Sequence, residues 1–402
     1  MIDQQNIPLP ASSSIPLRSV RDWFNAHARE LIQPEARAAI KSLVSRINKT
    51  ISRACFWRWE LASIPRGENE LFQFVYLGRR TRRGQAMAQF SQNTAKQYIS
   101  GNSASVKRAS VVLIGDFATP GSLRVPIEIH TAIPLNRTIE EISSAYDHSM
   151  RRVIRQEKSR SEVRHVVDSA AINNAERDML RPYAAARYGR DAAQIDESVV
   201  QQIAVTHGRL DVVYQEGKPV SCHLGYRSTH QGRKYWHGMR FGYTEAVFSD
   251  PKRLFRINSV NSYLAIEWAI NNNYDYYGFG FSLGQPDDGL LQWKRRRGAH
   301  LDSSLKRDHF YVRLPKTGVA QLLWNTPLFD DKDGSYDLHI GLPAQLSDAE
   351  AIDRYLLIGF GGISTVYVHH ARPISEALLA AFQNLYSSYN SATTIKTLFV
   401  SS

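Results

Sequence analysis

The stretch that decides the fold is residues 274–299, YDYYGFGFSLGQPDDGLLQWKRRRGA. Its first part, Tyr274 to Phe281, has the aromatic composition of a strand and is interrupted by Gly. Gly and Pro in residues 284–289 then predict a polar loop. The stretch ends in four cations, Lys294 to Arg297, before a Gly. A strand that leads through a loop into consecutive cations is typical of an anion site, although such a run also fits a solvated basic turn.

A helical pattern from Val260 to Asn271 leads directly into this strand. The order of helix, Gly-bearing strand, loop and Lys-containing segment resembles the second lobe of the Fem-type aminoacyl-tRNA-dependent transferases, a branch of the GNAT acyltransferase superfamily. The residues that carry the resemblance are Tyr274, Asp275, Gly278, Gly280, Gly289, Leu290, Trp293, Lys294 and Gly298. Trp293 stands where the family usually has Phe. The resemblance extends weakly back to about Thr138 and does not identify a substrate.

The resemblance implies an α+β protein with two GNAT-like lobes, each a mixed, mostly antiparallel sheet flanked by helices. We expect the first lobe in residues 1–137, completed by residues 315–402, and the second lobe, with the acyl-transfer cleft, in residues 138–314. The alternation of apolar residues and turns agrees with this for the second lobe. It predicts an antiparallel meander of three strands, at Leu210–Tyr214, Val220–Arg227 and Lys234–Tyr243.

The segment after Pro315 also alternates between strand and helix patterns. Strands are predicted at Tyr336–Ile340, Leu356–Phe360 and Val366–His369, and helices near Ser347–Tyr355 and Ser375–Tyr386. A hydrophobic strand pair needs a partner sheet. We therefore expect these strands to join the first lobe and not to form a third domain.

The positive charge of the chain is concentrated near its beginning. Of the 402 residues 43% are hydrophobic, enough for a sizeable core, and 50 Lys and Arg face 38 Asp and Glu. Up to Arg164 there are 25 basic and 14 acidic residues, which leaves the rest of the chain almost neutral. This asymmetry indicates a polyanionic partner such as RNA, a nucleotide-bearing substrate or an anionic membrane, or else serves only solubility.

The two cysteines, Cys55 and Cys222, have no metal-ligand spacing and predict free thiols and not a disulfide framework. No other arrangement of His and Cys predicts a metal site. The first residues lack the apolar core of a signal peptide, and no apolar run is long enough to span a bilayer. We expect a cytoplasmic protein whose oligomeric state the sequence does not indicate.

Three basic segments are predicted to meet phosphates, and one of them is the run of cations at residues 295–297. A typical GNAT protein that uses acetyl-CoA holds the pyrophosphate on a Gly-rich loop at a helix N-terminus, but the corresponding residues 249–262 contain no Gly. Their cations could neutralise a phosphate or simply begin a solvated helix. Another set lies on the helix predicted at residues 139–156, which in the resemblance introduces the second lobe. The predicted phosphate- or RNA-binding residues are Arg151, Arg152, Arg155, Lys252, Arg253, Arg256, Arg295, Arg296 and Arg297.

Acyl transfer to an amine requires a positioned amine and donors aimed at the developing oxyanion. We expect Lys294 to supply that donor, Asp275 to orient or deprotonate the amine, and His237 to border the same cleft. Each of these residues also fits a purely structural role; Asp275, for example, could cap the end of a strand. The predicted substrate-binding residues are Trp293, which could stack on a base, and Tyr277, Arg240, Tyr243, Ser282 and Gln285.

The resemblance implies an amide-forming acyltransferase that moves an aminoacyl group from aminoacyl-tRNA to an amine of a small molecule or peptide, without a tightly bound cofactor. One alternative donor is acyl-CoA or an acyl carrier protein. Another alternative is a protein of a different class, which binds RNA or a peptidoglycan precursor without catalysis.

Overall fold

The computed structural model describes residues 59–64, 72–91, 110–189, 197–305, 308–332, 334–388 and 392–400. The chain divides into two compact units, Met1–Glu60 and Leu61–Ser402. Nearly all described residues belong to the second unit, and Cys55 lies outside them. The description below is therefore that of the second unit.

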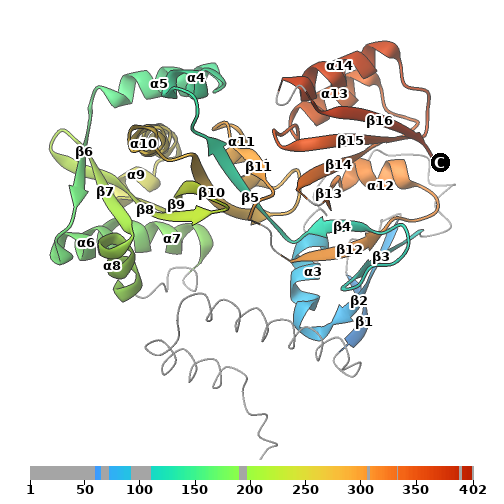
Figure 1. Ribbon diagram of the computed structural model, residues 1–402, viewed down its shortest axis with the longest axis horizontal. Coiled ribbons are helices and arrows are strands. Elements are labelled where there is room, and N and C mark those ends of the chain that lie inside the picture. The colour runs from blue at the N-terminus through green and yellow to red at the C-terminus, as the bar shows by residue number, and fades with distance from the viewer. Residues whose placement is uncertain are drawn as a thin grey trace, which may run out of the picture. The chain divides into compact units, whose positions relative to one another are not determined.

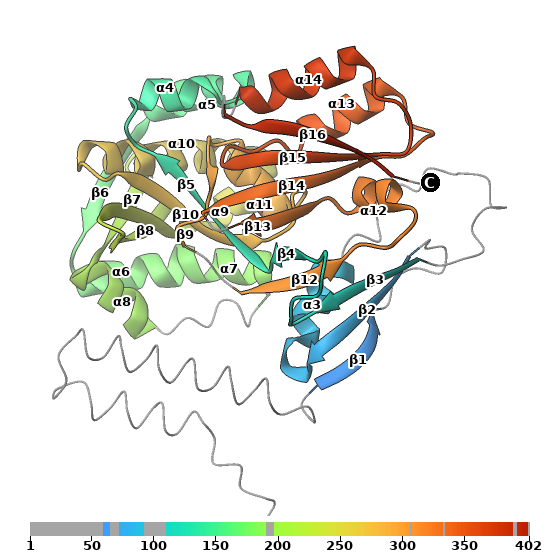
Figure 2. The same ribbon diagram turned by 45° about the vertical axis from the view of Figure 1, so that its right-hand side comes forward.

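Three mixed sheets make up the described fold, together with helices (Figures 1 and 2), so the predicted α+β class is confirmed. Sheet A has the strand order β1 (Trp59–Ile64), β2 (Phe72–Arg79), β3 (Ser110–Gly115), β12 (His309–Arg313), β4 (Leu123–Pro126). Sheet B has the order β11 (His300–Asp302), β5 (Glu128–Pro134), β10 (Tyr276–Leu283), β9 (Arg233–Tyr243), β8 (Lys218–His230), β7 (Gly208–Gln215), β6 (Ser161–Val166). Sheet C has the order β13 (Leu328–Lys332), β14 (Ser335–Leu342), β15 (Ile363–His370), β16 (Thr394–Phe399).

The helices mostly begin at side chains that accept hydrogen bonds from the first helical N–H groups. Thr138 and Ser347 form capping boxes, and Asp250 caps the longest described helix. The described α-helices are α3 (Arg83–Ser91), α4 (Ile139–Ser144), α5 (His148–Lys158), α6 (Ser169–Ala175), α7 (Arg181–Tyr188), α8 (Glu197–Thr206), α9 (Glu245–Phe248), α10 (Pro251–Asn271), α11 (Gly289–Arg295), α12 (Val319–Asn325), α13 (Asp348–Leu356) and α14 (Glu376–Ser387). A π-helical turn, Glu176–Leu180, joins α6 to α7.

Sheet B is covered by helices on both faces, which its alternating side chains explain. On β7, Val212 packs with α6 and α8, whereas its neighbour Val213 packs with α9 and α10. Figure 1 shows these two helix layers on opposite sides of the strands. The predicted meander is confirmed, because β7, β8 and β9 pair antiparallel in sequence order.

Two strands lie outside the residue ranges expected for their lobes. Strand β5 falls within residues 1–137 but pairs with β10 and β11 in sheet B. Strand β12 falls within residues 138–314 but pairs with β3 and β4 in sheet A. The division into two lobes remains a proposal. If it holds, β5 and β12 each belong to the sheet of the lobe other than the one expected from their residue numbers.

The strands after Pro315 form sheet C, in which β14, β15 and β16 run parallel. The strand predicted at Leu356–Phe360 is wrong: α13 continues to Leu356 and a turn follows it. Two of the apolar residues at 356–360, Ile358 and Phe360, are buried in the hydrophobic core beside sheet C. That core also includes Ile129 and Leu301 of sheet B, while α12 packs with the apolar residues of sheet A.

Candidate functional site

The site lies where two neighbouring strands of sheet B separate. Strands β9 and β10 pair in parallel over only three positions, the last of which joins Gly278 to His237. Beyond it, β10 pairs only with β5 and β9 only with β8. The ends of the two strands therefore open a passage between them, into which side chains from both can point.

A β-bulge at the opening turns the backbone of β10. The register with β5 shifts between Gly278 and Gly280, and Gly280 has φ +70°, a conformation that favours Gly. Directly after the bulge, the carbonyl oxygens of Gly280 and Phe281 both accept from the Lys294 ammonium at 2.9 Å. Lys294 comes from the last turn of α11, so the helix and the bulged strand are joined by this side chain.

Lys294 is the buried cation of the site. Its side chain is only 2% exposed. Burial lowers the pKa of Lys294 to about 7, against the smaller opposing effect of Asp288. An ammonium has three donors, and two of them are used by the strand carbonyls. The side chain is therefore close to the balance between amine and ammonium at neutral pH and remains a hydrogen-bond donor in both forms.

An aromatic cavity of about 360 Å³ lies on one side of the opening. Lys294 and Trp293 line it together with β9, β10 and α7. Its aromatic lining residues are Tyr183, Tyr226, Phe241, Tyr243, Phe279, Phe281 and Trp293. Arg240 also lines it but is paired at 3.2 Å with the buried Glu176 of the π-helical turn. The cavity thus offers flat apolar faces with a buried cation at one end.

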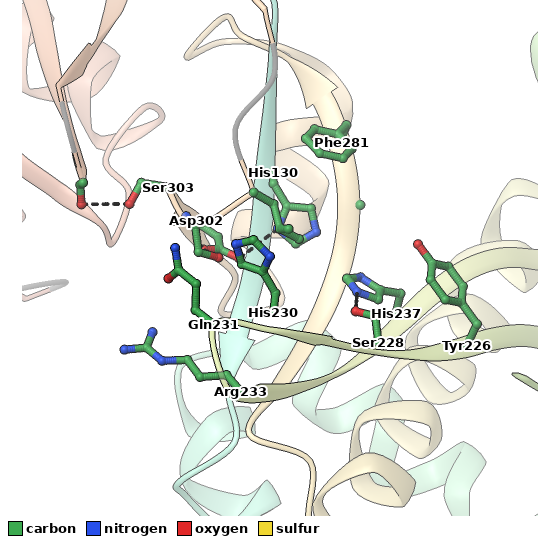
Figure 3. A pocket seen from close by; sticks show the side chains of 14 residues that line it. His130, Tyr226, Ser228, His230, Gln231, Arg233, His237, Phe281, Asp302 and Ser303 are labelled. Atoms are coloured by element: carbon green, nitrogen blue, oxygen red, sulfur yellow. Dashed lines mark hydrogen bonds and ion pairs between the residues drawn. The ribbon is translucent and has the colours of Figure 1, made fainter. Parts of the chain in front are cut away.

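A second, more polar cavity of about 1110 Å³ adjoins the aromatic one, and Figure 3 shows side chains that line it. It shares Tyr226, His237, Gly280 and Phe281 with the aromatic cavity. The rest of its lining is mostly polar and comes from the β8–β9 hairpin, β5, the end of β11 with the segment after it, and Gly334. The shared residues therefore mark the place where molecules bound in the two cavities would meet.

A hydrogen-bonded group in the polar cavity centres on Asp302. Its carboxylate accepts from His130 Nδ1 at 3.0 Å, from the Tyr235 hydroxyl at 3.2 Å, and from Ser304 N and Oγ at 3.0 and 2.6 Å. Burial acts to raise the pKa of Asp302, but the hydrogen bonds from His130 and Ser304 outweigh it and lower the pKa to about 2. Asp302 is therefore ionised and can only accept, which requires the proton of His130 to be on Nδ1.

His237 lies between the two cavities. Its ring stacks on Tyr235 and Tyr226, with centroids at 5.4 and 4.8 Å, and its Nε2 lies 2.8 Å from Ser228 Oγ. Burial lowers the pKa of His237 to about 4, so the ring is neutral at physiological pH. A Cβ on Gly278 would lie 2.5 Å from His237 Nδ1. The absence of a side chain at Gly278 is what allows this ring to fill the gap between β9 and β10.

The structure brings together five of the residues predicted for the site. Lys294, His237, Trp293, Arg240 and Tyr243 all line the aromatic cavity. Three other predicted residues, Tyr277, Ser282 and Gln285, are buried without lining either cavity. Tyr277 instead bonds His223 Nε2 through its hydroxyl at 3.1 Å.

Asp275 has a structural position at the start of β10, and the catalytic role expected for it stays a prediction. It is exposed, lines neither cavity, and accepts from Lys234 N at 2.7 Å. This bond and two backbone bonds, to Lys234 and Leu135, fix the start of β10 beside β9 and β5. The carboxylate therefore orders the strand end opposite to the opening.

The basic run Lys294 to Arg297 is not a uniform solvated turn. Arg297 is as buried as Lys294, and its guanidinium lies 3.8 Å from the centre of the Trp293 ring. Arg295 is partly buried and donates to Gln292, and Arg296 is exposed. The end of α11 and the residues after it thus send Lys294 and Arg297 into the core and Arg296 into solvent, and the buried Arg297 stacks on Trp293.

The start of α10 is already occupied by a carboxylate. Asp250 accepts from Lys252 N at 2.9 Å and from Arg253 N at 3.3 Å. These are N–H groups that a pyrophosphate would use at a helix N-terminus. The side chains of Lys252 and Arg253 are exposed, and Arg256 pairs with Glu157. Arg151, Arg152 and Arg155 lie exposed on α5, and among the described residues no ion pair involves them.

The sequence analysis missed His130, Asp302, Tyr235 and Ser304. One signal was present: His130 is a titratable residue in the middle of a largely apolar strand pattern, IEIHTAIP. Its partner Asp302 lies far along the chain, and only the insertion of β5 between β10 and β11 brings them together. Cys222 is free and buried, as predicted.

No group of three or more His, Cys, Asp or Glu in the described part of the chain is arranged to hold a metal ion. None of the helices described is long and apolar enough to cross a membrane.

No protein-family model matches the chain, and no curated protein matches it. Solved structures do. FemX is similar at 13% identity, over 65% of this chain and 90% of that one, with a TM-score of 0.36. L-PGS from Bacillus licheniformis is similar at 11% identity, over 63% and 79%, with a TM-score of 0.33. A tandem GNAT protein from the clavulanic acid biosynthesis pathway is similar at 10% identity, over 60% and 73%, with a TM-score of 0.27.

Proposed function

We propose that this protein is an acyltransferase that forms an amide, by direct transfer of an acyl or aminoacyl group to an amine. The observation that carries the proposal is the meeting of two chemically different cavities at the separated strands β9 and β10, with His237, Gly280 and Phe281 common to both. One cavity is aromatic and ends at a buried cation, and the other is polar. A donor and an acceptor bound from opposite sides would bring their reacting atoms to the same point, which is the main requirement of such a reaction.

Direct transfer is proposed because neither cavity offers a cysteine that could carry the acyl group as a covalent intermediate. Cys222 is fully buried, and burial raises the pKa of its thiol, so a thiolate intermediate there is disfavoured. Cys222 lines neither cavity, and neither does any other Cys among the described residues. The amine nitrogen would therefore attack the acyl carbon itself, and the ester or thioester bond would break in the same active site.

Lys294 is proposed as the group that stabilises the oxyanion of the tetrahedral intermediate. Its two bonds to the carbonyls of Gly280 and Phe281 hold the nitrogen in place before any substrate binds, and a preorganised donor costs no reorganisation during the reaction. The site is buried, so a charge there acts more strongly than in water.

The proposed donor is aminoacyl-tRNA, as the sequence resemblance implies. Two features support it over acyl-CoA: Asp250 occupies the start of α10, and the exposed arginines of α5 offer a surface for phosphates. The aromatic cavity has ring faces on which a terminal base could stack. The acceptor would be a small molecule or peptide with a free amine. Acyl-CoA or an acyl carrier protein is the alternative donor.

The test is transfer of radiolabel by the purified protein from a pool of charged tRNA, or from a pool of acyl-CoA, to added amines. We expect amide-linked label from the tRNA pool. Lys294→Ala should lower turnover by about 10²–10³, as loss of one oxyanion donor does, and Lys294→Arg should not restore it, because a planar fork replaces a compact charge. Lys218→Ala removes the same charge from the exposed start of β8, which lines neither cavity, and should leave turnover unchanged.

Binding of both pools without turnover would contradict catalysis and favour a binding protein. Label transferred only from acyl-CoA would keep the reaction but replace the donor. A Lys294→Ala protein with unchanged turnover would remove Lys294 from the mechanism.

A further inference from the structure

We infer that His130 is the general base of the site, that it takes the proton of the acceptor amine through Nε2, and that the polar cavity is where the amine enters. The inference rests on the proposed function, which it deepens by assigning a role to each cavity. Asp302 acts through His130 and is a positioning residue.

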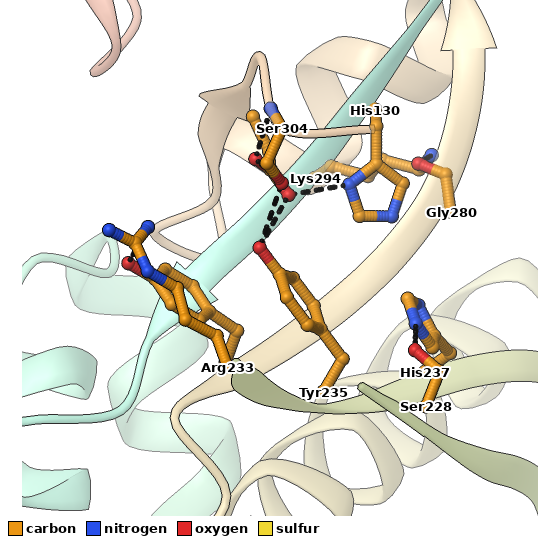
Figure 4. Close-up of polar contacts among 10 residues, drawn as sticks. His130, Ser228, Arg233, Tyr235, His237, Gly280, Lys294 and Ser304 are labelled. Carbon is orange, nitrogen blue, oxygen red and sulfur yellow. Dashed lines mark hydrogen bonds and ion pairs between the residues drawn. The ribbon is translucent and has the colours of Figure 1, made fainter. Parts of the chain in front are cut away.

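The first step is the orientation of the imidazole. Asp302 fixes the Nδ1 proton of His130 at 3.0 Å and is itself held by Tyr235 and Ser304. The opposite nitrogen, Nε2, therefore carries the lone pair. In Figure 4 the ring is turned so that one nitrogen is bonded on the Ser304 side and the other lies toward Gly280 and His237.

The second step is that this lone pair has no partner in the protein. His130 is 1% exposed, and its Nε2 is a buried atom without a hydrogen bond to any described residue. A buried polar atom left unsatisfied costs free energy, and in a cavity lining it is satisfied when a donor enters. An amine N–H is such a donor, so binding of the acceptor would satisfy His130 Nε2 and place the amine proton next to the nitrogen that takes it.

The third step is the location. The His130 ring centre lies 5.1 Å from that of Phe281 and 5.7 Å from that of His237, two of the residues common to both cavities. His237 is less suited to the role, because Ser228 occupies its Nε2 and burial lowers its pKa to about 4. His230 also lines the polar cavity and has an unpartnered Nε2, but among the described residues no carboxylate orients it.

The proton balance of the transfer follows from these positions. The neutral amine attacks the acyl carbon, and the C–N bond forms as one amine proton passes to His130 Nε2. The C–O bond of the donor ester then breaks, and the proton on His130 passes to the leaving ribose oxygen. No other reactant is consumed, and an acceptor that arrives as an ammonium ion first releases its extra proton to solvent.

Two amines separate this role from a structural one. Once its nitrogen is bonded to the acyl carbon, the more basic amine, ethanolamine, holds its proton more tightly than hydroxylamine does. Transfer to ethanolamine therefore depends more on a base that takes this proton. With the donor found active above, His130→Gln should lower transfer to ethanolamine by about 10²-fold or more, and transfer to hydroxylamine, corrected for the uncatalysed reaction, by less than about tenfold. His165→Gln changes an exposed histidine that lines neither cavity; it is the matched control and should change neither rate. Equal losses with both amines, or the same amine-dependent loss in His230→Gln in place of His130→Gln, would overturn the assignment.

A spectroscopic arm is independent of turnover. In protein labelled with ¹⁵N-histidine, the His130 signal, assigned by its absence in His130→Gln, should show a protonated Nδ1 and an unprotonated Nε2. Asp302→Asn should shift it toward the other tautomer and lower transfer to ethanolamine more than transfer to hydroxylamine. A proton on Nε2 in the wild type would overturn the inference. The expected tautomer together with no transfer from any donor would instead count against the proposed function alone.

Discussion

At the scale of single residues, the site depends on groups whose burial sets their protonation. Lys294 is the clearest case, because burial lowers its pKa to about 7 while an unfolded lysine titrates near 10.4. Between these values the unfolded chain binds the extra proton and the folded chain does not, so this residue makes stability rise with pH from about 7 upward. Below pH 7 both states are protonated and the burial of the charge costs its full amount.

We therefore predict that Lys294→Met removes this pH dependence. Met keeps an apolar stem of similar length but carries no titrating group. The difference in unfolding free energy between wild type and variant should shift in favour of the wild type from pH 7 to pH 9, by at most about 1.4 kcal/mol per pH unit. Denaturant titrations at several pH values measure it. A difference that stays constant over this range would mean that Lys294 titrates normally in the folded protein.

The residues of the site that the sequence revealed are those with a local signature. Lys294 and Trp293 belong to one short motif, and the motif placed both correctly beside the opening. His130 and Asp302 are separated by most of sheet B in sequence and are joined only by the insertion of β5 between β10 and β11. A side-chain pair of that kind has no local pattern, and Asp275 was chosen in its place because it sat inside the motif.

At the scale of elements, apolar alternation and turns predicted most strands of sheet B, because one turn sets the register of each neighbouring pair. They failed at Leu356–Phe360, where apolar residues follow the end of a helix and fill a core without forming a strand. They also gave no hint that β9 and β10 separate, since a partial pairing depends on Gly residues and on what lies between the strands.

Gly278 tests how closely β9 and β10 approach. A Cβ there would lie 2.5 Å from His237 Nδ1 and 3.3 Å from His130 Cε1. Gly278→Ala should therefore destabilise the protein by about 1–3 kcal/mol, the usual cost of overpacking. Adding His237→Ala should recover part of the loss by removing the obstructing ring. Gly289→Ala is the control, because a Cβ at the start of α11 meets nothing within 4 Å and should change stability by less than about 0.5 kcal/mol.

Denaturation midpoints of the three variants, at unchanged m-values, give the comparison. If Gly278→Ala were as stable as the Gly289→Ala control, the histidine would have room to move. The narrow gap between the strands would then not be what positions it.

At the scale of the whole molecule, the uneven distribution of charge suggests how a large polyanion would bind. Arg151, Arg152 and Arg155 project from one exposed helix, and no described carboxylate pairs with them. An unpaired arginine can exchange its counterions for a phosphate without first breaking an ion pair. A paired arginine, such as Arg177 with Asp178, must first break its ion pair with the carboxylate before it can bind a phosphate.

We predict that changing all three α5 arginines to Gln weakens binding of a total tRNA pool and flattens its salt dependence. Each lost phosphate contact should reduce the slope of log K against log salt by about 0.7–0.9, so the three together should reduce it by about 2–3 units. The matched control removes the same charge from arginines that are paired, at Arg160, Arg164 and Arg177. Fluorescence anisotropy with labelled tRNA at several salt concentrations measures both. Equal slopes for the two triple variants would show that net charge alone drives binding, and α5 would lose its place in the proposed RNA surface.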